Sequence, residues 1–218
     1  MEPTIYKPGA NNTPGIYNGA GGIYNGCGVY NDGVGGGDVT EIEIGGKVYP
    51  VKKIGSLYWI TEHLTANGPD LGITGYWPVG KPNPQSTYPG YFYNINNNTQ
   101  YQSIMQAVYP FRVPTFNDYY NLQEVCNNNT NGVMKKGFPN YPNATDETGF
   151  SAIPCGSYNL NSGVSLQGRT CHMLYVIVNS QGNFSNKGRC VLQSNTTFSF
   201  TQISGTSECA CLRVCMDA

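Results

Sequence analysis

The first 37 residues repeat one short unit, in which an apolar residue is followed by Tyr, one or two further residues, most of them turn-forming, and then Gly. The copies begin 11, 7 and 6 residues apart, and four short units at irregular spacing cannot bury a core of their own. A flexible linker is the alternative, but Gly/Ser linkers do not carry an apolar-Tyr pair in each unit. We expect an anchoring or oligomerisation segment over 1–37 that orders on a partner surface. Its anchoring residues are Ile5, Tyr6, Ile16, Tyr17, Ile23, Tyr24, Val29 and Tyr30.

From Asp38 onward the composition changes to alternating β-branched and polar residues, which indicates a folded domain over 38–218. The segments 39–44 and 47–54 flank Gly45-Gly46 and predict a hairpin. A further strand is expected over 57–64. The Pro/Gly/Asn-rich stretch 66–89 has almost no periodicity and predicts a long ordered loop.

Two helices are expected, over 98–108 and 115–127. Thr115 and Asp118 have the spacing of a capping box, and an apolar stripe follows. The stripe consists of Phe116, Tyr119, Tyr120 and Leu122. Strands are expected over 149–154, 170–178, 189–201 and 208–216. The expected class is α+β, with short helices and mostly antiparallel strands.

In the strand expected over 208–216, cysteine and apolar side chains alternate between two faces. One face carries Ala210, Leu212, Val214 and Met216, and the other carries Cys209, Cys211, Arg213 and Cys215.

The charge pattern and the chain start exclude some partners and favour others. Charged residues make up 11% of the chain and the net charge is −1, so no basic surface is expected for nucleic acid. No apolar run is long enough for a membrane span. The start at Met1 lacks the features of a secretory signal, which favours synthesis in a cytoplasm without stable disulfides among the eight cysteines.

Five segments, in order, resemble the Fibrobacter succinogenes major paralogous domain, a family with a C-type-lectin-like fold. They are Val51-Lys52-Lys53-Ile54-Gly55 with Trp59-Ile60-Thr61-Glu62-His63-Leu64; Gly90-Tyr91-Phe92-Tyr93-Asn94; Arg112-Val113-Pro114-Thr115 with Asp118-Tyr119 and Leu122; Gly149-Phe150-Ser151-Ala152-Ile153-Pro154-Cys155-Gly156-Ser157-Tyr158; and Leu212-Arg213-Val214-Cys215-Met216-Asp217. The resemblance covers 39–218. It implies a C-type-lectin-like domain that serves binding or display and carries out no defined reaction.

The chain departs from this family at two places. Tyr109-Pro110-Phe111 replaces a Cys-Pro-x-Gly-Trp motif, and Cys171-His172-Met173-Leu174-Tyr175 replaces an aromatic segment. The Glu-Pro-Asn and Trp-Asn-Asp motifs of calcium lectins are also missing from the expected place. Calcium-dependent sugar binding is therefore not expected.

The cysteines do not predict a metal site. Cys209, Cys211 and Cys215, with His172 as a fourth ligand, form the tightest cluster in the sequence. A strand would place Cys209 and Cys215 about 20 Å apart, so buried thiols acting as small apolar residues are the better interpretation.

A catalytic pair of His172 with Cys155, Cys171 or Cys190 is the most plausible nucleophilic arrangement. No nucleophile motif surrounds any of these cysteines, so we expect no enzyme, no catalytic residue, no cofactor and no metal.

The ligand site is expected around the long loop, where aromatic and amide side chains gather. Aromatic faces beside amides suit sugar rings or protein surfaces. The candidate residues are Tyr76, Trp77, Tyr88, Tyr91 and Asn96.

The expected function is a non-enzymatic virion display protein: a head fibre or tail decoration of a phage of gut Bacteroidetes-type bacteria. It would dock on capsid or tail proteins through 1–37, form a homo-oligomer, with a trimer favoured, and face host-surface glycan or protein. The alternative is a secreted or surface-anchored bacterial adhesin, located outside the cell or on its surface.

Overall fold

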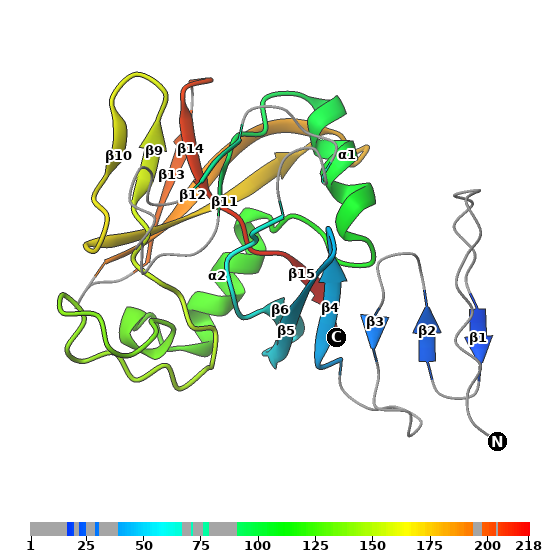
Figure 1. Cartoon of the computed structure of the whole chain (residues 1–218), viewed down its shortest axis with the longest axis horizontal. Coiled ribbons are helices and arrows are strands. Elements are labelled where there is room, and N and C mark those ends of the chain that lie inside the picture. Colours follow the sequence, from blue (N-terminus) through cyan, green and yellow to red (C-terminus); the bar gives the residue numbers. More distant parts are fainter. Residues whose placement is uncertain are drawn as a thin grey trace.

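The computed structural model describes residues 17–19, 22–24, 29–30, 39–66, 71, 76–78, 91–193, 198–203 and 205–218. Most described strands belong to two sheets, accompanied by helices α1 (Asn98–Val108) and α2 (Phe116–Val125) and the short 3₁₀ turn η1 (Thr130–Gly132) (Figure 1). The fold is therefore α+β with mostly antiparallel strands, as expected. No helix in the described part is long and apolar enough to cross a membrane.

The larger sheet has β11 (Thr170–Val178) and β12 (Phe184–Gln193) at its centre. Its other strands in this order are β10 (Gly163–Ser165), β9 (Ser157–Asn159), β14 (Glu208–Cys211) and β13 (Ser199–Ile203). Among the described residues, the strands follow one another across the sheet as β10-β9-β14-β11-β12-β13. β8 (Tyr91–Tyr93) also pairs with β14, and β7 (Tyr76–Pro78) pairs with β8. The described strand pairs of this sheet are antiparallel, except that β11 and β14 run parallel.

The smaller sheet has the order β15-β6-β5-β4-β3. It consists of β15 (Cys215–Asp217), β6 (Leu57–Ile60), β5 (Lys47–Ile54), β4 (Glu41–Ile44) and β3 (Val29–Tyr30). The last strand of the chain thus closes one edge, and the last of the four N-terminal repeats forms the other. Farther out, β1 (Tyr17–Gly19) pairs with β2 (Gly22–Tyr24) (Figure 1).

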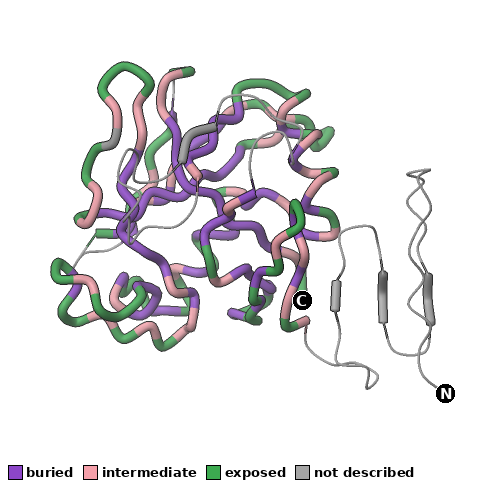
Figure 2. Tube along the Cα trace, viewed as in Figure 1, coloured by how far each residue is buried: buried purple, intermediate pink, exposed green. Residues whose placement is uncertain are grey.

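The strands at the centre separate two apolar cores. Along β11, Met173 and Tyr175 belong to one core and Leu174 and Val176 to the other. Helix α2 covers the first core with Tyr119 and Leu122, and α1 covers the second with Tyr101, Ile104 and Val108. Figure 2 shows the buried chain running through the middle of the domain. Because both faces of β11 are buried, its apolar run lacks the polar alternation of a half-exposed strand.

The expected alternation near the C-terminus is confirmed. Cys209, Cys211 and Cys215 lie in the first core, and Ala210, Leu212 and Val214 lie in the second. The segment is nevertheless two strands, β14 and β15, rather than one over 208–216.

The hairpin and the helices match the prediction. β4 and β5 flank Gly45 and Gly46, whose positive φ angles of 58° and 76° suit a tight hairpin turn. Helix α1 spans the predicted residues, and α2 begins after Thr115. Strand β11 also has the predicted bounds.

Three predicted elements were wrong in part. Residues 149–154 form no strand, because Ser151 adopts a φ of 56° and only Ala152 makes a bridge, to Met134. The strand expected over 57–64 ends at Ile60. The strand expected over 189–201 is two strands, β12 and β13, that pair with each other.

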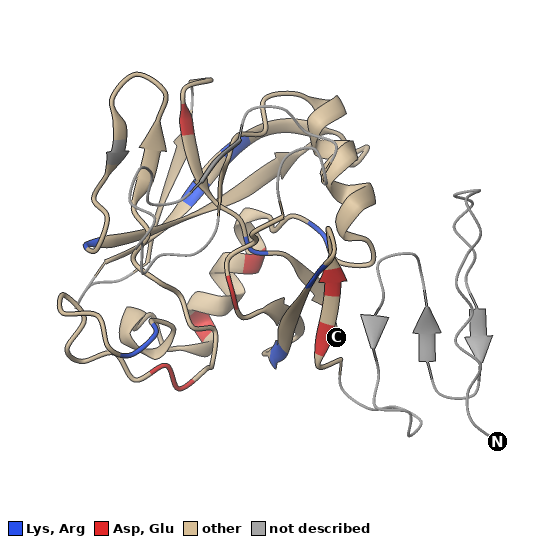
Figure 3. Cartoon of the chain, viewed as in Figure 1, with Lys and Arg blue, Asp and Glu red and all other residues tan. Residues whose placement is uncertain are grey.

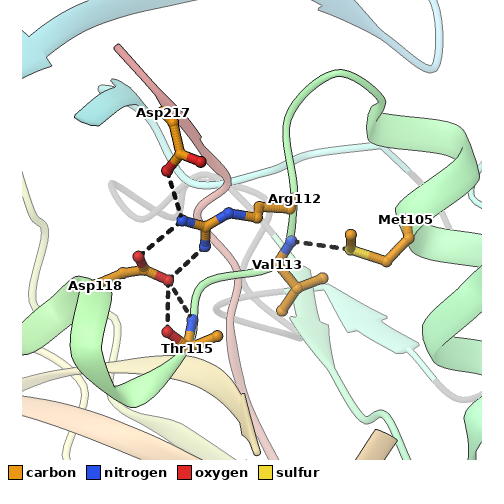
Figure 4. Close-up of polar contacts among 6 residues, drawn as sticks. All are labelled: Met105, Arg112, Val113, Thr115, Asp118 and Asp217. Atoms are coloured by element: carbon orange, nitrogen blue, oxygen red, sulfur yellow. Dashed lines mark hydrogen bonds and ion pairs between the residues drawn. The ribbon is translucent and has the colours of Figure 1, made fainter. Parts of the chain in front are cut away.

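An ion-pair network holds the start of α2 to the end of the chain (Figure 4). Arg112 donates to both carboxylate oxygens of Asp118, at 2.5 and 2.9 Å, and to Asp217 at 3.1 Å. Asp118 also accepts from the backbone N–H and the hydroxyl of Thr115, at 2.6 and 2.8 Å, which caps the helix. Other charged residues are scattered along the described part of the chain, and positions of both signs occur in the view of Figure 3.

Candidate functional site

The predicted ligand site is described only in part. Tyr76 and Trp77 lie in β7, opposite Tyr93 and Phe92 of β8, but their side chains fall outside the described residues, as does all of Tyr88. Tyr91 is half-buried, and its ring lies edge-on to that of Tyr93, with centroids 6.3 Å apart. β7 and β8 therefore bring three of the five predicted residues to one edge of the larger sheet.

Asn96, the predicted amide ligand, is already engaged with the protein. Its carboxamide oxygen accepts from the Lys187 ammonium at 2.5 Å, and the same ammonium donates to Asn94. Asn94 in turn donates to the carbonyl of Thr206. Burial lowers the pKa of Lys187. Asn96 therefore serves to satisfy a buried cation, which leaves less of its amide for a ligand.

An exposed aromatic cluster lies elsewhere, where α2 meets β11 and β13. Phe116 stacks on Tyr120 with centroids 6.1 Å apart, and its ring also meets Phe200 at 4.7 Å and Tyr175 at 6.0 Å. Phe116 and Tyr120 are 40% and 45% exposed, whereas Tyr175 is buried. We call these four residues the aromatic cluster.

The exposure of Phe116 and Tyr120 corrects the apolar stripe predicted for this helix. Only Tyr119 and Leu122 of that stripe enter the core, so the buried face is narrower than expected. Asn117 and Asn121 are exposed, one residue after each of the two exposed rings. Residues four apart share a helix face, so α2 presents two rings with amides beside them. The pairs Phe116-Asn117 and Tyr120-Asn121, four residues apart in a predicted helix, were the sequence signal that could have indicated this surface.

The anchoring residues fall mostly on short strands. Tyr17 lies opposite Tyr24 in the β1–β2 pair, and Val29 and Tyr30 lie opposite Ile42 and Glu41 in the smaller sheet. Ile23 is in β2. Ile5, Tyr6 and Ile16 lie outside the described residues.

A second candidate site, which sequence reasoning missed, is a fully buried cluster of thiols with one imidazole. The Sγ atoms of Cys155 and Cys211 lie 2.8 Å apart, and the Sγ of Cys171 lies 3.8 Å from Nε2 of His63. The ligand-type atoms of His63, Cys155 and Cys211 all lie within 4.8 Å of one another. We call these four residues the thiol–imidazole cluster.

The four residues come from four distant places in the chain. His63 follows β6, Cys155 precedes β9, Cys171 lies in β11 and Cys211 ends β14. The parallel pair β11–β14 places Met173 opposite Cys211, and Gly156 bridges to Cys171. This non-local assembly left no spacing signal in the sequence.

Arg213 lies beside this cluster and is fully buried. Its guanidinium donates to the carbonyls of Ile60, Phe150 and Ser151 at 2.7 to 3.0 Å, and its Nε donates to Nδ1 of His63 at 3.3 Å. It also lies over the Phe150 ring, 4.6 Å from the centroid. The hydrogen bonds that Arg213 makes among the described residues thus go to neutral acceptors, and a buried cation in this setting favours a negative charge nearby.

The pKa shifts in the cluster follow from this arrangement. Burial lowers the pKa of His63, so its imidazole is neutral. Burial also opposes ionisation of Cys155, but hydrogen bonds from Cys171 and Cys211 and the nearby His63 outweigh it, and the pKa of Cys155 falls well below its ordinary value. Burial raises the pKa of Cys171 and of Cys211. Cys155 is therefore the sulfur of the group that ionises most readily.

The pairing of His172 with a cysteine, which was considered from sequence as the most plausible catalytic arrangement and not expected, is not formed among the described residues. Successive residues of β11 point to opposite faces, so Cys171 faces the first core and His172 the other side. Both ring nitrogens of His172 lack a hydrogen-bond partner among the described residues, and burial lowers its pKa to about 4. The imidazole that meets the thiols is that of His63, which sequence reasoning had assigned to a strand motif.

Buried thiols were predicted for Cys209, Cys211 and Cys215, and this is confirmed. The cysteines of the thiol–imidazole cluster are likewise fully buried. No substrate can reach their sulfur atoms in this conformation, so the cluster offers covalent or ionic chemistry within the protein and not turnover.

No family model matches the chain, and the comparisons with curated proteins and with solved structures found no match. The five-segment resemblance to the Fibrobacter paralogous domain therefore stays a prediction.

Proposed function

We propose that this chain is a non-enzymatic display protein of a virion, a head fibre or tail decoration, that docks by its N-terminal repeats and presents a lectin-like domain to glycans on the host surface. The observation that carries the binding part is the exposed Phe116–Tyr120 pair with Asn117 and Asn121 beside it. Aromatic faces give sugar rings a large contact area, and amides satisfy the hydroxyl groups at the ring edge.

The aromatic cluster is held in place from below, which suits a binding surface. Phe116 rests against Phe200 and the buried Tyr175, and Tyr175 lies over Gly188 of β12. A ring fixed by packing loses little further freedom when a ligand stacks on it. We therefore place the ligand site here, in preference to Asn96, whose amide oxygen holds Lys187.

The pairing of Val29–Tyr30 with β4 supports the docking part. In this arrangement the last apolar-Tyr repeat adds one strand, β3, to the edge of the smaller sheet, and strand addition is a common way for protein segments to join a partner. The same repeats supplied by several copies would support the trimer favoured from sequence.

The binding proposal is tested with full-length protein on an array of bacterial surface glycans. Phe116→Ala and Tyr120→Ala should each weaken binding about tenfold or more, because stacking is worth about 1 to 3 kcal/mol per ring. The control is Leu160→Ala, which removes a comparably exposed apolar side chain from another part of the domain. Equal binding by all three variants would exclude the aromatic cluster as the site.

The virion context is tested separately by mass spectrometry of density-purified phage particles with immunogold labelling against 38–218. Stoichiometric protein with gold on the particle exterior is the expected result. Absence from particles, with the protein on the bacterial envelope, would replace the viral proposal with the surface adhesin.

A further inference from the structure

The closest contact in the thiol–imidazole cluster is between Cys155 and Cys211, whose Sγ atoms are 2.8 Å apart. Neither sulfur is exposed to solvent. In this structure Cys211 donates a hydrogen bond to Cys155, and two further states would use the same short distance: a shared metal ion or a covalent bond. The surrounding hydrogen bonds distinguish between them.

A metal ion fits the atom types but not the geometry. Three cysteines and one histidine are a common donor set for structural zinc. However, Arg213 donates its Nε–H to Nδ1 of His63, so the neutral imidazole carries its proton on Nε2. That proton occupies the lone-pair position that a metal at Nε2 would need. Two thiolates on one zinc also lie about 3.7 Å apart, which follows from Zn–S bonds of about 2.3 Å at a tetrahedral angle. The observed sulfur atoms are closer than this.

The same bonds favour attack by Cys155 on a disulfide. Cys211 donates its S–H to Cys155, so Cys155 is the acceptor sulfur of the pair, and the imidazole of His63 lies within 4.8 Å of both sulfur atoms. The same ring contacts the Sγ of Cys171 through Nε2 and accepts from Arg213 through Nδ1. A sulfur atom held beside a donor and a cation is the nucleophile in thiol–disulfide exchange. Cys211 lies at the distance from which it can attack in turn.

We propose that Cys155 and Cys211 are a cross-linking site, at which a small disulfide such as oxidised glutathione closes an intramolecular bond between β14 and the segment before β9. The Cys155 thiolate attacks one sulfur of the oxidant and releases one glutathione thiolate. The Cys211 thiolate then attacks the Cys155 sulfur of the mixed disulfide and releases the second. The two cysteines lose two electrons and two protons, and the oxidant becomes two molecules of reduced glutathione.

The bond has a defined place in the fold and a defined order of events. It joins residues 56 positions apart, so it restricts the unfolded chain strongly. Because both sulfurs are buried, oxidation takes place during folding or by opening of the segment 149–156, and the finished bond is shielded from reductants. Cys171 stays a thiol beside His63. This inference does not depend on the proposed function.

The test is refolding of the full chain from denaturant in a glutathione redox buffer, followed by alkylation of free thiols and peptide mapping. We expect one dominant cross-linked peptide pair, Cys155 with Cys211, an intact mass lower by two hydrogens, and a Tm raised by about 5 °C or more over the reduced protein. Cys190→Ser, which removes a buried thiol outside the pair, should retain the cross-link. Cys211→Ser should lose it.

Eight free thiols after refolding, or a dominant cross-link that includes Cys171 or any other cysteine, would overturn the proposal. The peptide map of the unchanged chain decides this even if a Ser variant fails to fold. Metal analysis of protein purified under reducing conditions is a second check. One equivalent of tightly bound zinc, released by Cys155→Ser and retained by Cys190→Ser, would replace the cross-link with a metal site.

Discussion

Arg112 and Asp118 form a two-pronged ion pair across the first turn of α2, and the same carboxylate caps that helix through Thr115. One buried side chain thus neutralises a guanidinium, satisfies a helix N-terminus and, through Arg112, meets Asp217 in the last strand. Removing Asp118 should therefore disturb three elements together.

Asp118→Asn should lower the free energy of unfolding by about 2 to 3 kcal/mol, because a charge-assisted pair and part of a cap are lost in a buried place. Urea unfolding at pH 7 measures this. The control is Asp217→Asn, whose side chain is 85% exposed and also contacts Arg112, and it should cost about 0.5 kcal/mol or less. If Asp118→Asn and Asp217→Asn lose the same free energy of unfolding, the burial of Asp118 adds nothing to the strength of its ion pair.

The pH dependence of stability should also depend on Asp118. Burial opposes its ionisation, but hydrogen bonds from Arg112 and Thr115 outweigh burial and hold its pKa below the ordinary value. A lowered folded-state pKa stabilises the fold above the unfolded pKa, and this contribution is lost as pH falls through the folded pKa. The stability gap between wild type and Asp118→Asn should therefore be constant from pH 7 to 5 and shrink below about pH 4, the ordinary aspartate pKa. If the difference in stability between wild type and Asp118→Asn stays constant down to pH 3, the pKa of Asp118 does not contribute to the pH dependence of stability.

Local patterns in the sequence predicted the elements whose stability is local. The Gly45-Gly46 turn, the Thr115–Asp118 cap and the apolar run of β11 each lie within a few residues, and the structure has all three. Residues 149–154 read as a strand because they are apolar. The backbone carbonyls of Phe150 and Ser151 instead bind Arg213, which is 62 residues or more away and leaves no local signal.

The resembling segments meet in space and hold one another in place. Arg213 of the last segment binds Ile60 and His63 of the first and Phe150 of the fourth, and Arg112 of the third binds Asp217 of the last. The aromatic cluster, by contrast, is built largely from residues outside these segments. The sequence motifs therefore identified residues that hold the domain together, whereas the exposed aromatic cluster could be identified only once the fold was known.

Gly156 and Gly46 offer a matched test of backbone strain against packing. Both have a positive φ, of 75° and 76°, but a Cβ at Gly156 would lie 2.1 Å from the carbonyl oxygen of Ser165, whereas a Cβ at Gly46 would meet nothing within 4 Å. Gly46→Ala should cost about 1 kcal/mol from φ alone, and Gly156→Ala about 3 kcal/mol or more, since backbone must move. Chemical unfolding of both variants checks the difference. If both variants lose the same free energy of unfolding, the backbone around Gly156 shifts to accommodate a Cβ at little energetic cost.

Arg213→Lys should show that the shape of the buried cation matters as well as its charge. Lysine keeps the charge, but its single ammonium cannot reach the carbonyls of Ile60, Phe150 and Ser151 while also donating to His63. Buried carbonyls without a donor cost about 1 to 3 kcal/mol each, so we expect a loss of about 3 kcal/mol or more, or no soluble protein. The control is Arg189→Lys, since Arg189 is only partly buried and pairs with Glu208 near the surface, and it should cost about 1 kcal/mol or less. If Arg213→Lys unfolds at the same urea concentration as Arg189→Lys, the carbonyls of 150 and 151 are satisfied in another way and the segment 149–156 is not held by Arg213.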